Sequence, residues 1–521
     1  MTEPFIQQTE VVASGPAHSP LFLIGVMACC MLGPFINILD SNVVNVALPR
    51  MMSGLATDVL TIRWVVTAYL IATAVTMPAI SWIGRRLGNQ RLYALGLSVF
   101  TSASALCGLA PSVEFLIFFR IVQGIGAGVL MPISWTLMME IAPPEQRGMA
   151  TSIWAIGASF GSLAGLPIGG YFADAVDWRT VFYVNLIPGG LAVLGTLLLM
   201  PASAREDRTP FDVWGFLSLS TALVSLLVAL SQVQHEGWDS PFILTLLGLC
   251  GLAIPLFLFI ETHVATPLID LSLYASLLYA SGTVVTIIMG VFFYASSFLV
   301  ILFAQLVLDL SVQQSALVLI PGSFAMISTA FISGWLVDRF EPRGALLLGL
   351  LGFGACCYLM MIADRRVTAG FIVWVYVWRG FGLGFLNAPT FAISTSGLAP
   401  QRARQASSLL SLCLVLGGTF GISLLSTLLD RWRTMHQAHF AELQMHTALG
   451  TQQALRIFTE MADYLGVAPG YAGLYARGQL SQLIWREALV YALNDCFASL
   501  LVLTLCCAGF VLMMRIVRQP G

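Results

Sequence analysis

The sequence predicts an all-α polytopic membrane protein with 14 transmembrane helices, and its composition and apolar runs lead to this prediction. Of 521 residues, 58% are hydrophobic and only 10% are charged, whereas a soluble globular protein carries about 25% charged residues. The apolar runs reach the roughly 20 residues that a membrane-spanning helix needs. They are much longer than the roughly 10-residue alternating segments of an outer-membrane barrel. The composition therefore argues against a soluble enzyme and against a disordered chain.

The predicted spans follow one another with mostly short connections. They lie near residues 20–46, 60–83, 92–110, 114–138, 149–173, 180–200, 214–233, 240–260, 277–302, 315–337, 345–363, 369–397, 406–429 and 488–514. The exception is residues 430–487, a hydrophilic stretch before the last span that we expect to form a long outer loop.

The distribution of arginine predicts the orientation, because short cytoplasmic loops carry an excess of basic residues. All 24 basic residues are Arg and the net charge is −2. If both termini are cytoplasmic, the inner side holds Arg85, Arg86, Arg91, Arg147, Arg205, Arg208, Arg339, Arg343, Arg402, Arg404, Arg515 and Arg518. The short outer loops then hold only Arg50, Arg63, Arg179, Arg365 and Arg366. We therefore expect both termini inside, and no nucleic-acid partner, since there is no basic excess.

We expect no metal, cofactor or catalytic centre. The ten cysteines lie in or beside apolar runs and lack the spacing of a metal site, so we interpret them as small buried hydrophobes. His436 and His439 form an HxxH pair in the predicted outer loop, near His446. Without a third ligand at usable spacing, this pair is interpreted as part of a solvated helical face. Residues 1–20 contain no basic residue, so no cleavable signal peptide is expected.

Two segments repeat across the chain. Residues 81–87 match residues 334–340 at an offset of 253, and Arg120 has a counterpart in Arg379 at an offset of 259. Parallel six-helix halves are a transporter architecture, and the offset requires two additional helices between them. We predict a first half over residues 1–200, a linker with two extra helices over 201–275, and a second half over 276–521.

Charged groups inside a membrane are costly and indicate function by default. Asp40 lies midway along the first span, where low dielectric disfavours the charged carboxylate and suits a group that binds and releases protons. The alternative is a structural carboxylate bonded to Asn42, Asn45 or another helix. Arg120 cannot deprotonate, so it either tunes a nearby carboxylate or pairs with it.

Two further charged residues lie in predicted spans of the second half. For Arg379, we favour structural pairing. Asp495 lies about two turns into the last span. It is either a second protonation site or a helix cap or interhelical bond, and we favour the latter.

The fifth span is rich in small residues. It contains Gly157, Gly161, Gly165, Pro167, Gly169 and Gly170. A spacing of four places the first four glycines on one face, where backbones can approach closely. We expect either ordinary packing or a pliable, tightly packed hinge between the halves.

The repeated loop motifs have a mechanical interpretation. The first copy contains Arg85, Arg86 and Gly88. The second copy contains Gly334, Asp338 and Arg339. Such charges can tie neighbouring helix ends together and keep one access state closed, although inner-loop arginine is also expected from topology alone.

Together these segments resemble the major facilitator superfamily, in particular its fourteen-helix drug:proton antiporter branch (the EmrB/QacA subfamily). The similarity lies in the segments 39–49, 64–70, 120–127 and 211–216. The resemblance implies a role in proton coupling for Arg120.

Three positions depart from the family pattern. Arg85 stands where an Asp is usual, although Asp338 keeps that Asp in the second copy. The fifth-helix motif reads Gly165-Leu166-Pro167-Ile168-Gly169-Gly170, with the proline moved by one position. The sixth helix has Asn185-Leu186-Ile187-Pro188 in place of the usual Asn-Val-Pro.

From the resemblance we expect an inner-membrane antiporter that exports hydrophobic or amphiphilic toxic compounds in exchange for protons. Its partners would be that small substrate, protons and membrane lipid. A periplasmic adaptor and an outer-membrane channel would be further partners, contacted through residues 430–487. The alternatives are an exporter with one narrow substrate, such as a fatty acid, siderophore or aromatic acid, and a membrane sensor or scaffold that has lost transport.

Overall fold

The computed structural model describes residues 20–143, 146–201, 210–396, 398, 400–446 and 448–513. Over these ranges the chain is helices and connecting turns with no strand, which confirms the predicted all-α class. Arg205, Arg208, Arg515 and Arg518, which we used for the orientation, lie outside the described residues.

Residues 20–200 form the first group of helices. They are α1 (Pro20–Gly54), α2 (Val59–Thr76), η1 (Met77–Ala79), α3 (Ile80–Leu87), α4 (Asn89–Gly108), α5 (Val113–Ile141), α6 (Arg147–Ala175), α7 (Thr180–Tyr183) and α8 (Leu186–Leu199). Polar side chains start several of them, as when Asp58 accepts a hydrogen bond from the Thr61 backbone at 2.6 Å. Gly88, at φ +85°, makes the turn between α3 and α4, a conformation that side chains with a Cβ rarely adopt.

The remaining helices follow in the same manner. They are α9 (Val213–Glu236), α10 (Pro241–His263), η3 (Leu271–Ala275), α11 (Leu277–Leu306), α12 (Val312–Arg339), α13 (Pro342–Met361), α14 (Ala369–Thr395), α15 (Pro400–His446), α16 (Ala448–Tyr464) and α17 (Pro469–Met513). Ser311 and Gln314 form a reciprocal capping box that starts α12.

Thirteen segments among the described residues are long and apolar enough to cross a membrane. They correspond to all but one of the fourteen predicted spans. The remaining predicted span is α4, whose 20 residues include several serines and threonines that lower its mean hydropathy. Because α4 packs between α5 and α8, it belongs to the bundle as a fourteenth helix.

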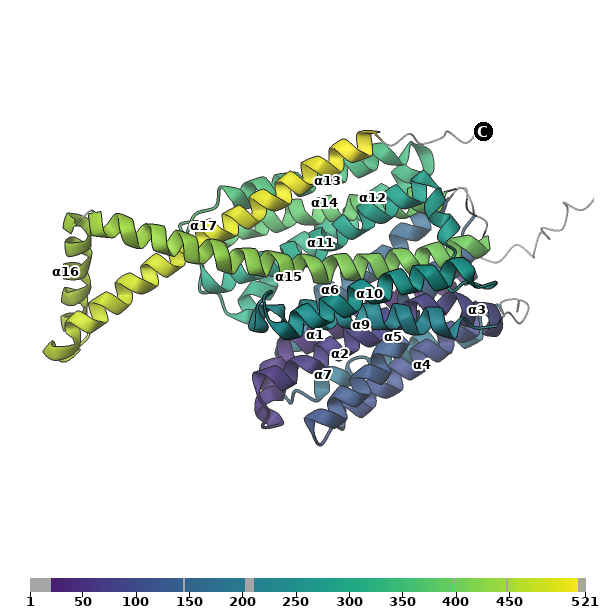
Figure 1. Cartoon of the computed structure of the whole chain (residues 1–521), viewed down its shortest axis with the longest axis horizontal. Coiled ribbons are helices and arrows are strands. Elements are labelled where there is room, and N and C mark those ends of the chain that lie inside the picture. Colours follow the sequence, from purple (N-terminus) through teal and green to yellow (C-terminus); the bar gives the residue numbers. More distant parts are fainter. Residues whose placement is uncertain are drawn as a thin grey trace, which may run out of the picture.

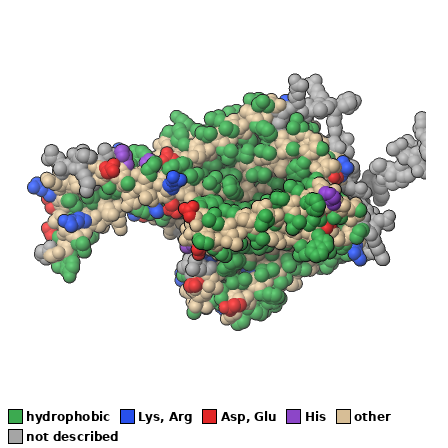
Figure 2. Space-filling view, in the orientation of Figure 1, with side chains coloured by type: hydrophobic (Ala, Val, Ile, Leu, Met, Phe, Trp, Pro, Cys, Tyr) green, Lys and Arg blue, Asp and Glu red, His purple; other side chains and the backbone are tan. Residues whose placement is uncertain are grey.

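Two large apolar clusters form the interior. One is built mainly from α1, α2, α4, α5 and α6, and the other mainly from α11, α13, α14, α15 and α17. The inserted pair, α9 and α10, packs as a hairpin, and α9 lies against both α2 and α15. Hydrophobic side chains cover most of the visible side of the bundle (Figure 2), as expected of a surface that faces lipid.

The described residues of 430–487, which we predicted as one long outer loop with a solvated helical face at His436 and His439, are mostly helical. α15 and α17 continue beyond the bundle and α16 joins their ends (Figure 1). We call this segment the projection. The stretch is rich in Ala, Leu and Gln, which favour helix, and Gly466 and Pro469 fall at the connection between α16 and α17, although Gly473 and Gly478 lie within α17. Its low hydropathy excludes a membrane span but not a helix.

Ion pairs fasten the base of the projection. Arg486 makes two hydrogen bonds to Asp309, at 2.7 and 2.9 Å. Arg365 lies 3.1 Å from Glu487. These contacts connect α17 to turns of the bundle at its projection end.

Candidate functional site

A buried polar network surrounds Asp40 on α1. The side chains of Asp40 and Arg120 are each 1% exposed. Arg120 Nη1 donates to Asp40 Oδ2 at 2.6 Å, while Gln123 Nε2 and Asn185 Nδ2 donate to Asp40 Oδ1 at 2.9 and 2.7 Å. We considered Asn42, Asn45 or another helix as bonding partners of Asp40. In the structure its partners come from other helices, and not from Asn42 or Asn45.

The helices explain why these side chains meet. Arg120 and Gln123 are one turn apart on α5 and so share a face, and Gln123 Oε1 also accepts from Arg120 at 2.8 Å. Asn185 lies at the break between α7 and α8, where it also donates to Ser104 at 3.1 Å. The Arg120 guanidinium lies 4.0 Å from the centre of the Tyr69 ring. The Asp40 carboxylate is thus charge-balanced and hydrogen-bonded at both oxygens, whereas the buried Asn185 Oδ1 and the Tyr69 hydroxyl have no hydrogen-bond partner among the described residues.

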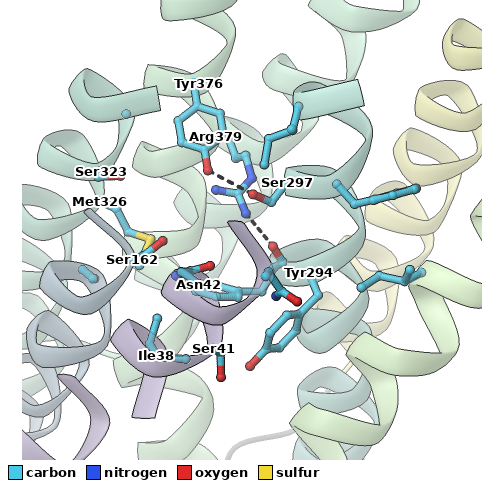
Figure 3. Close-up of a pocket in the computed structure, with 17 residues that line it drawn as sticks. Ile38, Ser41, Asn42, Ser162, Tyr294, Ser297, Ser323, Met326, Tyr376 and Arg379 are labelled. Carbon is cyan, nitrogen blue, oxygen red and sulfur yellow. Dashed lines mark hydrogen bonds between the residues drawn. The ribbon is translucent and has the colours of Figure 1, made fainter. Parts of the chain in front are cut away.

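Two cavities lie next to this network. The first, of about 390 Å³, is lined by Arg379, Asn42, Ser162, Tyr294 and others, and we call it the Arg379 cavity (Figure 3). The second, of about 260 Å³, is lined by Arg120, Tyr69, Asn37, Thr73 and others, and we call it the Arg120 cavity. Ser41, Asn45, Tyr294 and Ile422 line both. Asp40 itself lines neither cavity, whereas its partner Arg120 lines the second.

Arg379 on α14 is 4% exposed and is held by uncharged groups. Its Nε donates to Ser296 Oγ at 2.8 Å and its Nη2 donates to the Phe293 carbonyl. The Tyr376 ring centre lies 4.7 Å away. Among the described residues no carboxylate lies within ion-pair distance. The structural pairing that we favoured for Arg379 is therefore with a hydroxyl and a carbonyl, not with an acid.

Asp495 lies far from Asp40 in the fold, at the base of the projection. Its Oδ2 is 2.7 Å from Nε2 of His436 on α15, so it makes the kind of interhelical bond that we favoured. His436 also lies near the rings of Phe440 and Tyr491. The HxxH pair thus supplies one partner of an interhelical contact, and the described residues contain no metal-binding cluster.

The glycines of α6 face α1. A Cβ on Gly157 or Gly161 would collide with the carbonyl of Met31 or Phe35, and one on Gly165 would lie 2.6 Å from the Asn42 Cβ. Gly169 packs on Val43, whereas Gly170 has its nearest neighbour at 4.0 Å. The predicted close face is present, but it packs on a helix of the same predicted half.

The contact of α6 with α12 joins the two predicted halves. The Asp338 carboxylate accepts the backbone N–H groups of Gly148 and Met149 at 2.6 and 2.9 Å, at the N-terminus of α6. A Cβ on Gly334 would lie 2.7 Å from the Gly148 carbonyl. Further contacts between the predicted halves, from Thr136 to Ser407 and from Ser408 to Met77, lie at the same end of the bundle. This end, opposite the projection, is closed.

The first loop motif has a related geometry. Arg86 lies over the Trp82 ring at 5.4 Å and Arg339 lies over Trp335 at 4.7 Å, so both copies stack an arginine on the tryptophan of the preceding turn. Arg85 is half-buried in the last turn of α3, which contacts α15.

Sequence reasoning named no site role for Gln123, Asn185, Ser296 or His436, although Gln123 lies in the segment 120–127, Asn185 in the sixth-helix motif and His436 in the HxxH pair. Gln123 had a detectable signal, since it lies one turn from Arg120. Asn185 is a polar residue three positions before Pro188 in an apolar run. Ser296 gave no signal, because a serine in a membrane helix usually bonds its own backbone.

Comparisons with known proteins agree with this geometry. The model of the Major Facilitator Superfamily matches residues 30–422. The chain is 30% identical over 489 residues to the tetracenomycin C resistance and export protein of Streptomyces glaucescens, covering 92% of this chain and 90% of that protein. It is 26% identical to the multidrug export protein EmrB of Escherichia coli (strain K12), covering 89% and 90%.

Two more comparisons extend this result. The fatty acid resistance protein FarB of Neisseria gonorrhoeae is 27% identical, over 79% of this chain and 82% of that protein. A bacterial homologue of the human lysosomal transporter Spinster, solved in an inward-facing and unoccupied conformation, superposes with a TM-score of 0.53 at 17% identity, covering 96% of this chain and all of that one. Two of these relatives are named as export proteins, and the solved structure is of a homologue of a transporter. The buried network, the two cavities and these matches together show that the chain belongs to the Major Facilitator Superfamily, on its EmrB/QacA-like multidrug side.

Proposed function

We propose that the protein is a proton-coupled antiporter that exports hydrophobic or amphiphilic compounds across the bacterial inner membrane. The observation that carries the proposal is the buried ion pair of Asp40 and Arg120, in which Arg120 also lines the neighbouring cavity. An ion pair at this depth is costly to build. It suits a group whose charge changes during a transport cycle.

Proton binding by Asp40 changes the interactions of Arg120. A protonated Asp40 no longer neutralises the guanidinium, which then turns toward the Arg120 cavity that it already lines. Because Asp40 lines neither cavity, coupling runs through Arg120 and the packing of α1 on α5, rather than through competition for one carboxylate. Antiport requires that substrate binding and proton binding oppose each other, and by reciprocal linkage each then lowers the affinity for the other by the same factor. Asp495, paired with His436, is the second candidate for a protonation site.

We propose that the two predicted halves, residues 1–200 and 276–521, move relative to each other to alternate between the access states. The helix pair in residues 201–275 lies between the halves in the sequence. In this proposal both termini are cytoplasmic, so the closed end faces the cytoplasm. Asp338 holds that end shut by capping α6. The glycine face of α6, with Pro167, is the proposed hinge, because it lets α6 slide along α1 with little side-chain interlocking.

Proton release in inverted membrane vesicles tests this proposal. We expect uncharged or charged amphiphiles to dissipate an imposed proton gradient with the native protein but not with Asp40→Asn. Asp239→Asn, which changes an exposed carboxylate in the same way, is the control and should behave like the native protein. If the native protein responds to no compound of a broad panel, or if Asp40→Asn responds fully, the proposal is wrong.

The projection is the proposed contact for a periplasmic adaptor that continues to an outer-membrane channel. Large apolar side chains are exposed at its tip, including Tyr464 at 92% and Leu474 at 71%. Exposed apolar groups on a polar segment are typical of a docking surface.

Replacing residues 444–482 by a short flexible linker, which keeps His436 beside Asp495 and Arg486 beside Asp309, should abolish resistance of whole cells while vesicle transport remains. Replacing only Tyr464 and Leu474 by Ser is the milder version, which keeps the helices and should have the same effect on cells. If cells remain resistant after both changes, the adaptor is not needed.

A further inference from the structure

We infer that the Arg379 cavity binds amphiphilic anions, with the carboxylate or phenolate head group on Arg379. The inference rests on the proposed function, since it names the class of compound that the antiporter would carry. It follows from the charge and the unused hydrogen-bonding capacity of one buried side chain.

Arg379 is a buried cation without an acid. Its guanidinium remains charged at any relevant pH, and a buried charge that lacks a counter-charge is strongly unfavourable. Ser296, the Phe293 carbonyl and the Tyr376 ring solvate the guanidinium without neutralising it. In the described part of the chain, no residue accepts a hydrogen bond from Nη1. The guanidinium thus keeps a free edge, and Figure 3 shows it beside the cavity, between Tyr376 and Asn42.

The comparison with Arg120 shows what is missing. Both arginines lie in a glycine-rich helix and stack on a tyrosine ring. Arg120 donates to the Val65 carbonyl on α2, and Arg379 donates to Ser296 on α11. Arg120 meets Asp40 on α1, whereas Arg379 meets Ser296 on α11. Ser296 follows Asp40 by 256 residues, between the two repeat offsets of 253 and 259. A neutral hydroxyl therefore occupies the place of the carboxylate, and an anionic ligand would supply the absent charge.

The cavity walls complete an amphiphile site. No Asp or Glu is among the residues that line either cavity, so nothing there compensates a cation. Phe298, Ile301 and Ile422 line the Arg379 cavity and provide an apolar wall for a ring or chain. Ser297 and Ser323 add hydroxyl groups close to the arginine. The planar guanidinium fork matches a carboxylate with two parallel hydrogen bonds.

The test compares three naphthalenes that differ only in one substituent: a carboxylate, a hydroxymethyl or an aminomethyl group. Their binding to the full-length protein in lipid nanodiscs is measured by titration at a pH where the acid is ionised and the amine is protonated. We expect the carboxylate to bind roughly tenfold or more tightly than the alcohol, and the amine to bind most weakly.

Four variants assign the preference to Arg379. Arg379→Gln removes the charge, and Ser296→Asp supplies an internal counter-charge while leaving the arginine in place. Both should bind acid and alcohol equally, with the affinity for the alcohol unchanged, which reports an intact cavity. Arg379→Lys should keep part of the preference, and Arg343→Gln, at the start of α13, should keep all of it.

The inference is overturned if the native protein binds the amine as well as the acid, binds none of the three, or keeps its acid preference in Arg379→Gln. Should Ser296→Asp fail to fold, Arg379→Gln and Arg379→Lys still decide. An acid preference that depends on Arg379, together with no substrate-induced proton release by the native protein, would retain the inference and reject antiport. The reverse result would retain antiport and reject the inference.

Discussion

At the scale of single residues, the buried Asp40 carboxylate is costly to place in the membrane and is hydrogen-bonded at both oxygens. Both oxygens of Asp40 accept hydrogen bonds, and its charge is balanced by Arg120. In a low-dielectric interior, removing one partner is more harmful than removing both, because the remaining charge is then buried alone. The pair is therefore expected to be strongly non-additive under mutation.

A double-mutant cycle checks this expectation. Arg120→Gln should destabilise the protein by about 3–5 kcal/mol, because Asp40 loses its counter-charge. The double variant Asp40→Asn with Arg120→Gln should be more stable than Arg120→Gln alone. The measurement is the thermal unfolding midpoint in detergent. Simple additivity of the two single changes would show that the pair is not an isolated ion pair.

At the scale of helices, the closeness of α6 and α1 depends on glycine. Gly161 faces the Phe35 carbonyl and the Leu39 backbone nitrogen, whereas Gly170 has open space to 4.0 Å. Gly161→Ala should therefore force the helices apart and cost about 1–3 kcal/mol. Gly170→Ala, nine residues along the same helix, is the matched control and should be tolerated. Equal unfolding midpoints for the two variants would mean that α6 adjusts without strain.

A second helix-scale prediction concerns the contact in which Asp338 of α12 caps the N-terminus of α6. Asp338→Asn weakens the capping of the α6 N-terminus, which should cost about 1 kcal/mol. Hydrogen exchange read by mass spectrometry should then be faster in the peptide around Gly148 and Met149. Asp309→Asn, which alters a pair with Arg486 at the other end, should leave that peptide unchanged. Unchanged exchange in Asp338→Asn would show that other contacts keep this end closed.

Among the described residues, the capping carboxylate of Asp338 in the second loop motif has no acidic counterpart in the first. Arg85 occupies the position equivalent to Asp338, and a positive side chain does not stabilise a helix N-terminus. The closed end is therefore asymmetric in its electrostatics, although both motifs stack an arginine on a tryptophan.

At the scale of the whole molecule, the sequence predicted what depends on local composition. The spans followed from long apolar runs, and Asp40, Arg120 and Arg379 were conspicuous because charges are rare in such runs. The partners of these residues depend on tertiary contacts. Nothing in the sequence near Asn185 or Ser296 indicates that one faces Asp40 and the other faces Arg379.

The projection shows a different limit. Low hydropathy predicted residues 430–487 as an outer loop, and only the HxxH pair was interpreted as helical, because hydropathy distinguishes membrane from water and not helix from coil. The Ala, Leu and Gln content that makes this stretch helical is informative only when helix propensity is considered separately from burial.

The projection also has a mechanical consequence. α15 is 47 residues long, which corresponds to about 70 Å at about 1.5 Å per residue, and it runs unbroken from the closed end of the bundle to the projection (Figure 1). Gly417 and Gly421 bring it tightly against α11, so these two helices tilt together. A tilt of about 10° about one end would carry the far end through about 12 Å. The helix would then act as a lever that transmits a rocking movement of the bundle within the bilayer to the projection outside it. A partner bound to the tip would move with each transport cycle and would also oppose that movement.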